Sequence, residues 1–185
     1  MKPATRMTIA ALGLTLVLVT GCASDAEQPA TPSGPSTTSA VASAAPDGAA
    51  APAQLQFTAT TLDGEQFSGE SLLGSPAVLW FWAPWCPTCQ REAPMVGQAA
   101  ADHPGVRFLG VAGLDQPPAM QQFVDRYPVD DFTHLADVDG EVWTKFGVTQ
   151  QPAFAFVSAD GAVDVVRGTL SEPELTERID ALTGG

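Results

Sequence analysis

Between residues 54 and 185, apolar and polar positions alternate in blocks that predict a regular series of strands and helices. The run from Ala77 to Trp82 is apolar on both faces, which is typical of a central strand in a sheet that is covered on both sides. A second buried strand is predicted from Val106 to Ala112. Shorter strands are predicted to form two hairpins, 57–60 with 66–67 around Asp63-Gly64, and 153–157 with 162–166.

The predicted helices fall between and after these strands. Ser171 and Glu174 have the spacing of a capping box, so the last helix is expected to begin there and to run to about Leu182. The other helices are predicted at 86–101, 117–126 and 141–146. The order of a β-hairpin, a βαβ unit, helices, a second hairpin and a final helix predicts an α/β domain with a mixed sheet.

The first 53 residues follow a different pattern. Lys2 and Arg6 precede an apolar stretch from Ile9 to Val19, which is the layout of an export signal and is short for a membrane span of about 20 residues. Residues 23–53 are rich in Ala, Pro, Ser, Thr and Gly and have almost no large apolar side chain, so we expect a disordered tether. The predicted organisation is a signal peptide at 1–21, Cys22 with a linker at 22–53, and one compact domain at 54–185.

Cys22 lies at the end of the predicted signal. The four residues Val19-Thr20-Gly21-Cys22 resemble the bacterial lipobox, which implies that Cys22 is lipidated and holds the chain on the outer face of the cell membrane. The alternatives are an unremarkable residue of a cleaved signal and a spare thiol. If Cys22 is an anchor, the remaining two cysteines form one closed pair.

The chain is strongly acidic, with a formal net charge of −13. Without Lys2 and Arg6 of the signal, six basic and 21 acidic residues remain, which is a formal charge of −15. Such a surface argues against binding to nucleic acid and against direct adhesion to anionic lipid. We expect the acidity to keep an exported protein soluble, and we expect these four acidic side chains to be solvated: Asp130, Asp131, Asp137 and Asp139.

The candidate chemistry lies directly after the strand that ends at Trp82, in the tetrapeptide Cys86-Pro87-Thr88-Cys89. A helix start leaves backbone N–H groups unpaired and carries a partial positive charge, so a cysteine there is favoured as the thiolate that attacks disulfides. Cys86 is therefore the expected nucleophile. Cys89, one helical turn later, is the expected resolving thiol. Pro87 suits the first helical position, and Thr88 lacks the positive charge that a histidine there would supply.

Other interpretations of this pair are a zinc half-site, a purely structural disulfide and two inert thiols. A structural zinc site needs four ligands, and the only other candidates are Cys22, His103 and His134. A disulfide kept for stability usually closes a longer loop, since a short loop removes little entropy from the unfolded chain. We therefore expect a redox pair, with no metal and no cofactor.

The segment from Trp80 to Pro94, Trp-Phe-Trp-Ala-Pro-Trp-Cys-Pro-Thr-Cys-Gln-Arg-Glu-Ala-Pro, resembles the signature of the extracytoplasmic thioredoxin-like family of the TlpA/ResA/DsbE type. The resemblance extends from residue 54 to the C-terminus. It implies a thioredoxin-like fold, with a central mixed β-sheet flanked by helices, an N-terminal β-hairpin and a central insertion between Val106 and Pro152.

The resemblance also implies roles for single residues. Trp85 is expected beside the nucleophile, with a core aromatic as the alternative. Gln151 and Pro152 resemble the cis-proline segment that pairs with a substrate peptide, and an ordinary trans proline that opens the strand is the alternative. Thioredoxins carry a buried acid six residues before the first cysteine, where this chain has Trp80. Glu92 matches a glutamate implicated in proton handling near the second cysteine, and a solvated helix glutamate is the alternative.

These expectations together predict an extracytoplasmic thiol-disulfide oxidoreductase. Resemblance favours an oxidant that acts on exported proteins with reduced cysteines and is reset by a membrane redox partner. The alternatives are a reductase in cytochrome c maturation and a surface lipoprotein that binds thiols without turnover. Peroxiredoxins share the fold, but they need a threonine or serine and a proline before the reactive cysteine, where this chain has Ala83 and Leu79.

Overall fold

The computed structural model describes residues 51–184, which are built around one five-stranded sheet. The strand order is β5-β4-β3-β6-β7. β3, β4 and β5 run parallel, and β6 and β7 run antiparallel to their neighbours, so the predicted mixed sheet is confirmed. The strands are β3 (Ala77–Trp82), β4 (Arg107–Gly113), β5 (Thr133–Asp137), β6 (Ala153–Val157) and β7 (Val163–Arg167).

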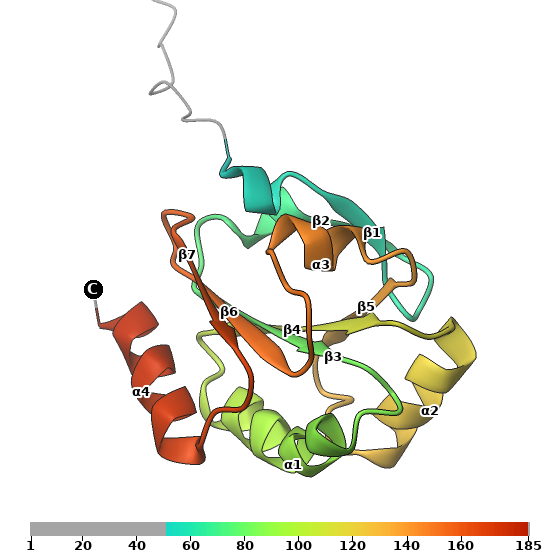
Figure 1. Cartoon of the computed structure of the whole chain (residues 1–185). Coiled ribbons are helices and arrows are strands. Elements are labelled where there is room, and N and C mark those ends of the chain that lie inside the picture. The colour runs from blue at the N-terminus through green and yellow to red at the C-terminus, as the bar shows by residue number, and fades with distance from the viewer. Residues whose placement is uncertain (1–50, 185) are drawn as a thin grey trace, which may run out of the picture. The chain divides into compact units, whose positions relative to one another are not determined.

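Helices and a small second sheet cover the two faces of the central sheet (Figure 1). α1 (Pro87–Asp102), α2 (Pro117–Arg126) and α4 (Glu172–Thr183) lie on one face. The other face is covered by α3 (Glu141–Lys145) and by the predicted hairpin, β1 (Thr58–Thr60) with β2 (Gln66–Ser68). Two short 3₁₀ turns, η1 (Ala53–Leu55) and η2 (Gly69–Leu72), flank that hairpin in the sequence.

The fully buried strand β3 divides the core into two clusters because successive side chains point to opposite faces. Val78, Trp80 and Trp82 belong to the cluster that contains both cysteines and the apolar residues of α1, α2 and α4. Leu79 and Phe81 belong to the cluster formed with α3 and the N-terminal hairpin. The continuous apolar run that predicted a covered strand is therefore explained by two separate packing surfaces.

Two sequence expectations about the region of Asp137 differ from the structure. We expected Asp137 to be solvated, but it is buried at the end of β5, and its two carboxylate oxygens accept hydrogen bonds from the backbone N–H groups of Val142 (3.1 Å) and Trp143 (2.9 Å). These are unpaired donors in the first turn of α3, which a carboxylate satisfies well. The strand Thr133–Asp137 had not been predicted, because it holds few apolar positions. Asp130, Asp131 and Asp139 are exposed as expected.

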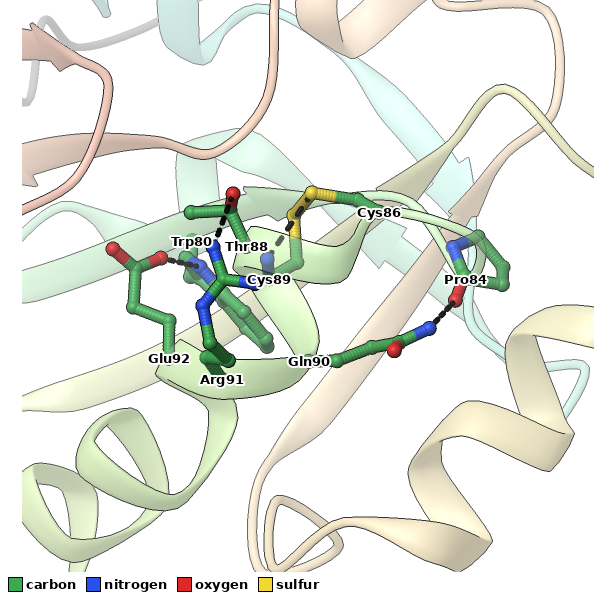
Figure 2. Close-up of a disulfide and its surroundings, with 8 residues drawn as sticks. All are labelled: Trp80, Pro84, Cys86, Thr88, Cys89, Gln90, Arg91 and Glu92. Carbon is green, nitrogen blue, oxygen red and sulfur yellow. Dashed lines mark hydrogen bonds between the residues drawn. A yellow bond between two sulfur atoms is a disulfide. The ribbon is translucent and has the colours of Figure 1, made fainter.

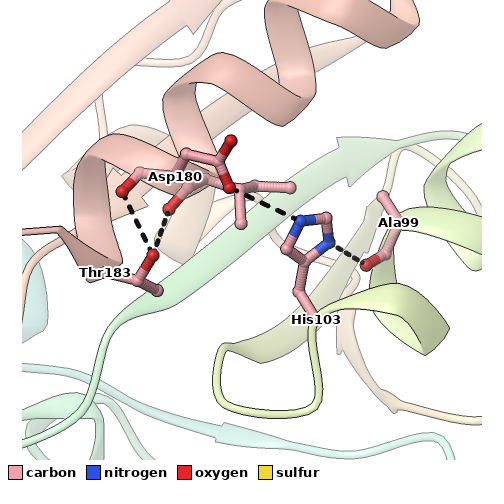
Figure 3. A network of polar contacts seen from close by, with 5 residues as sticks. Ala99, His103, Asp180 and Thr183 are labelled. Carbon is pink, nitrogen blue, oxygen red and sulfur yellow. Dashed lines mark hydrogen bonds and ion pairs between the residues drawn. The ribbon is translucent and has the colours of Figure 1, made fainter.

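The last helix begins with the predicted capping box and is linked to α1 at its far end. Glu174 accepts a hydrogen bond from the backbone N–H of Ser171 at 2.9 Å, and the hydroxyl of Ser171 caps the N–H of Glu174. At the C-terminus of α1, Nδ1 of His103 lies 2.8 Å from the carbonyl oxygen of Ala99, while Nε2 faces Asp180 of α4 at 3.8 Å (Figure 3). His103 thus connects α1 and α4, two of the three helices on this face of the sheet.

Gly97 allows α1 to approach the segment before β5 more closely than any other residue would. A Cβ at this position would lie 1.8 Å from the carbonyl oxygen of Pro128. Alanine is favoured over glycine inside a helix by about 1 kcal/mol. We expect the clash to outweigh this preference, because the atom that is too close belongs to the backbone and cannot move away by changing a side-chain rotamer. We expect Gly97→Ala to lower the free energy of unfolding by at least about 2 kcal/mol in urea denaturation.

The control for this prediction is Gly105→Ala, since no atom lies within 4 Å of a Cβ built at Gly105. Its unfolding free energy should remain within about 0.5 kcal/mol of the parent protein. Equal stability of the Gly97 and Gly105 variants would contradict the close approach.

The predicted signal peptide and Cys22 lie outside the described residues, as does the linker up to residue 50. Of the linker, residues 51–53 are described, and Ala53 already begins η1. Within residues 51–184, no helix has the length and hydropathy needed to cross a membrane.

Candidate redox site

The turn from β3 into α1 places Cys86 at the N-cap of the helix. Its backbone is extended, Pro87 occupies the first helical position, and the backbone N–H of Cys89 donates to Sγ of Cys86 at 3.1 Å (Figure 2). Gln90 braces the preceding turn by donating to the carbonyl of Pro84 at 3.0 Å. A sulfur that already accepts a helix N–H is stabilised as a thiolate when the pair is reduced. The predicted helix start is therefore confirmed, and it lies at the cysteine whose sulfur is expected to react.

Cys86 and Cys89 form a disulfide across one turn of the helix, with their Cα atoms 5.3 Å apart. The two cysteine residues differ slightly in their access to solvent. Cys86 keeps 4% of its surface exposed, whereas Cys89 is fully buried. An incoming thiolate would reach Cys86 first, and this asymmetry supports the assignment of Cys86 as nucleophile and Cys89 as resolving thiol.

Trp85 is exposed beside the disulfide, so the alternative that it is a core aromatic is wrong. More than half of its surface (53%) is accessible, and its indole N–H donates to the carbonyl of Leu114 at 3.2 Å. Leu114 is similarly exposed and has a φ of 61°, a left-handed backbone that costs a leucine about 1 kcal/mol. Both residues are exposed and apolar, and Trp85 directly precedes Cys86 in the chain. Sequence reasoning missed Leu114, because nothing in its local sequence signals a left-handed backbone.

Gln151 and Pro152 lie at the same edge of the sheet as the cysteine turn. The peptide bond between them is cis, as the resemblance implied. Ala153 pairs with Phe81, so Pro152 lies one position beyond the last paired residues, next to the end of β3. The carbonyl of Pro152 accepts from the backbone N–H of Gly168 at 2.9 Å. The register thus brings the proline segment and Cys86 to one edge, although they are 66 positions apart in the chain.

Glu92 is buried on α1, so the alternative of a solvated helix glutamate is wrong. Its Oε2 accepts a hydrogen bond from the indole N–H of Trp80 at 3.2 Å, while its buried Oε1 has no hydrogen-bond partner. Burial raises the pKa of Glu92 to about 7, with the Trp80 hydrogen bond and the backbone of Leu170 acting in the opposite direction. The carboxyl group is thus poised to gain or lose a proton near neutral pH.

The remaining candidates have local roles. Pro87 is exposed at the start of α1, and Thr88 accepts a hydrogen bond from the guanidinium of Arg91 at 3.1 Å. His134 is buried, with Nε2 2.7 Å from the carbonyl of Val129, and burial lowers its pKa to about 4. Among residues 51–184, no three His, Cys, Asp or Glu side chains are grouped so that they could hold a metal ion.

Similarity to known proteins covers the whole region that contains this site. A family model described as the AhpC/TSA family matches residues 48–166. MTB DsbF, solved in its mixed oxidised and reduced forms, is 72% identical, with a TM-score of 0.71 over 71% of this chain and 98% of that chain. A secreted Mycobacterium tuberculosis disulfide oxidoreductase homologous to E. coli DsbE is 50% identical, with a TM-score of 0.66 over 69% of this chain and 97% of that chain. The thiol-disulfide oxidoreductase ResA of Bacillus thuringiensis is 26% identical over 130 residues, which are 69% of this chain and 75% of ResA.

Proposed function

This chain belongs to the AhpC/TSA family and is a thiol-disulfide oxidoreductase of the DsbE/DsbF/ResA type, and from that premise we propose that it oxidises cysteine pairs in exported proteins outside the cytoplasm. The observation that carries the proposal is the disulfide at the N-terminus of α1, with Cys86 at the N-cap and 4% exposed, and with Cys89 fully buried. We do not extend the proposal to peroxide reduction. The position that a peroxidase needs for a threonine or serine is occupied by Ala83, and the position that it needs for a proline is occupied by Leu79.

The proposed reaction is two successive thiol-disulfide exchanges. A substrate thiolate attacks Sγ of Cys86, the bond between Cys86 and Cys89 breaks, and Cys89 leaves as a thiolate that takes up a proton. A second substrate thiolate then attacks the substrate sulfur of the mixed disulfide, and Cys86 leaves as a thiolate. The substrate loses two electrons and gains a disulfide, while the Cys86-Cys89 pair gains the two electrons.

The substrate is proposed to bind as an extended polypeptide across the end of the sheet that holds Cys86 and Pro152. β6 is paired with β3 and β7 on its two sides, so the substrate would pair with backbone groups of the turn beside Pro152 and would not add as a further strand of the sheet. Trp85 and Leu114, exposed next to Cys86, would contact apolar side chains near the substrate cysteine. Such apolar residues are accessible in exported chains that have not yet folded, which matches a substrate with reduced cysteines.

A cycle of oxidation also needs a partner that removes the two electrons again. We propose a membrane redox protein for this step, reached while Cys22 is lipidated and the linker acts as a tether. Secretion of the relative that is 50% identical supports an extracytoplasmic location. Reduction of apocytochrome thiols and binding of thiols without turnover are the two alternatives.

The direction of electron transfer depends on the reduction potential of the Cys86–Cys89 pair. Thr88 supplies no positive charge to the Cys86 thiolate, so we expect a reduction potential between those of thioredoxin, about −270 mV, and of the strongest periplasmic oxidant, about −120 mV. The potential is measured by equilibrating the chain with glutathione buffers and separating the two forms after alkylation. The oxidised protein should also form disulfides in a reduced, unfolded protein.

The alternatives give different results in the same assays. A potential at or below that of thioredoxin, together with rapid reduction of insulin, would assign the chain as a reductase. Neither oxidation nor reduction of a protein substrate would indicate binding without turnover. A matched control is the chain with Cys86→Ser and Cys89→Ser together, which keeps the apolar surface at Trp85 and Leu114 but has no redox pair.

A further inference from the structure

Trp80 and Glu92 form a buried polar pair beside the disulfide. Figure 2 shows their side chains pointing toward one another, Trp80 from β3 and Glu92 from α1, one helical turn beyond Cys89. The indole N–H of Trp80 donates to Oε2 at 3.2 Å, and no other side chain among residues 51–184 forms a hydrogen bond with Glu92. The strand position that holds an acid in thioredoxins thus supplies a donor here, and the acid is on the helix.

Packing holds the indole in place. Trp80 is fully buried, stacks on Trp82 with ring centroids 5.8 Å apart, and contacts Phe123 of α2 at 6.0 Å. Its backbone lies between Gly110 of β4 and Phe154 of β6. A donor fixed on three sides restricts the positions that the Glu92 carboxyl can occupy.

Charged groups do not explain the behaviour of this carboxyl. The titratable groups on the surrounding segments are Cys86, Cys89 and Arg91 on α1, Arg167 at the end of β7, and Glu172 and Glu174 at the start of α4. None of them forms an ion pair with Glu92 or shifts its pKa, which depends on burial, the Trp80 indole and the backbone of Leu170. The indole is therefore the group whose removal changes the carboxyl most directly.

We propose that Trp80 is a positioning residue for proton transfer at Cys89, because its indole N–H holds the carboxyl of Glu92, one helical turn after Cys89, and stabilises the carboxylate that forms when the proton leaves. This inference rests on the exchange mechanism proposed above. When the disulfide breaks, the protonated Glu92 gives its proton to the departing Cys89 thiolate, and the indole N–H stabilises the carboxylate that remains. When Cys89 later attacks a mixed disulfide at Cys86, its proton returns to that carboxylate.

The test compares Trp80→Phe with Trp82→Phe. Trp82 is the matched control because it is equally buried on the same face of β3, but its indole N–H has no hydrogen-bond partner. The readout is the rate at which Cys89 resolves a mixed disulfide between Cys86 and glutathione, measured across pH. That rate is expected to rise as Glu92 loses its proton, and the midpoint of this rise in the parent protein is the reference for both variants.

Removing a donor to the carboxylate favours the protonated carboxyl, so the midpoint in Trp80→Phe should rise by about one pH unit and the rate at pH 6 should fall about tenfold. In Trp82→Phe the midpoint should stay where it is in the parent protein. Adding Trp80→Phe to Glu92→Gln should have no further effect on the pH profile. A parental midpoint in Trp80→Phe, or equal shifts in both tryptophan variants, would overturn the inference.

A second measurement does not depend on the folding of the tryptophan variants. In the unsubstituted chain labelled with ¹⁵N, the Trp80 indole resonance should titrate with Glu92, whereas the Trp82 indole resonance should not, and Glu92→Gln should abolish the titration. An indole resonance of Trp80 that is independent of pH would refute the pairing. Failure of the unsubstituted chain to exchange with glutathione at any pH would instead count against the proposed function.

Discussion

Cys89→Ser should convert the protein into a trap that holds its substrate through Cys86. In this variant the Cys86 thiolate attacks the disulfide of an oxidised substrate, one substrate sulfur leaves as a thiolate, and the other stays bonded to Cys86. Without Cys89, this mixed disulfide loses the intramolecular thiol that would release it. A thiol held one turn away acts at an effective concentration far above that of a free thiol, so turnover should fall at least about 10³-fold. The buried position of Cys89 is compatible with serine, which differs from cysteine by one atom. The adduct is detected as a slower band on a non-reducing gel that disappears on reduction.

The matched control is Cys86→Ser, which retains the fully buried thiol of Cys89 and removes the thiol at the N-cap of α1. It should form little adduct, because Cys89 is covered and is not at the N-cap. Both variants are compared in a Cys22→Ser background, so that the third cysteine of the chain cannot contribute. Equal adduct formation by the two variants would show that the assignment of nucleophile and resolving thiol is wrong.

The sequence predicted the parts of this site that depend on short segments. An uninterrupted apolar strand is followed by Cys-Pro-Thr-Cys. The end of the strand and Pro87 favour a helix that begins at this point, so the position of the Cys86 sulfur can be predicted from a few consecutive residues. The capping box at Ser171 is likewise encoded in four consecutive residues. Such features are legible because their partners are close in the sequence.

Features that depend on distant partners could not be predicted in the same way. The burial of Glu92 follows from the packing of α1 against β3 and the segment before α4, and the burial of Asp137 follows from its place beside the start of α3. A glutamate on a helix has the same local sequence whether that face is covered or open. The left-handed backbone of Leu114 is likewise supported by its contact with Trp85, which lies 29 positions earlier.

Glu92 and His134 should make contributions to the pH dependence of stability that are similar in size and opposite in sign. The folded Glu92 has a pKa of about 7 against an ordinary value of 4.5. Between these values the unfolded carboxyl is ionised while the folded one keeps its proton, so the folded state binds more protons and stability falls as pH rises. With some solvent screening at the carboxyl, the loss is about 2 to 3 kcal/mol by pH 8.

His134 acts in the other direction over almost the same range. Its pKa in the folded protein is about 4 against an ordinary value of 6.5, because burial disfavours the charged ring. Between pH 4 and 6.5 the unfolded histidine binds a proton that the folded one does not, so stability rises with pH by about 3 kcal/mol. In the unsubstituted protein the two contributions largely cancel.

Glu92→Gln should therefore reveal the contribution of His134 and raise stability at alkaline pH. Glutamine keeps the shape of the side chain and its contact with Trp80 but has no proton to lose. The free energy of unfolding of this variant, measured by urea denaturation, should match that of the parent protein near pH 4. It should then exceed the parent value by about 2 to 3 kcal/mol at pH 8.

The control for the change in net charge is Glu177→Gln, which removes an exposed carboxylate from α4. Its stability should differ from the parent value by a constant amount of no more than about 0.5 kcal/mol across the same range. The difference between each variant and the parent isolates one carboxyl from the acid sensitivity of all the others. If the difference in unfolding free energy between Glu92→Gln and the parent protein does not grow between pH 4 and pH 8, the buried carboxyl has the same pKa in the folded and unfolded chains. In that case the protein loses no stability by keeping a proton donor beside its disulfide.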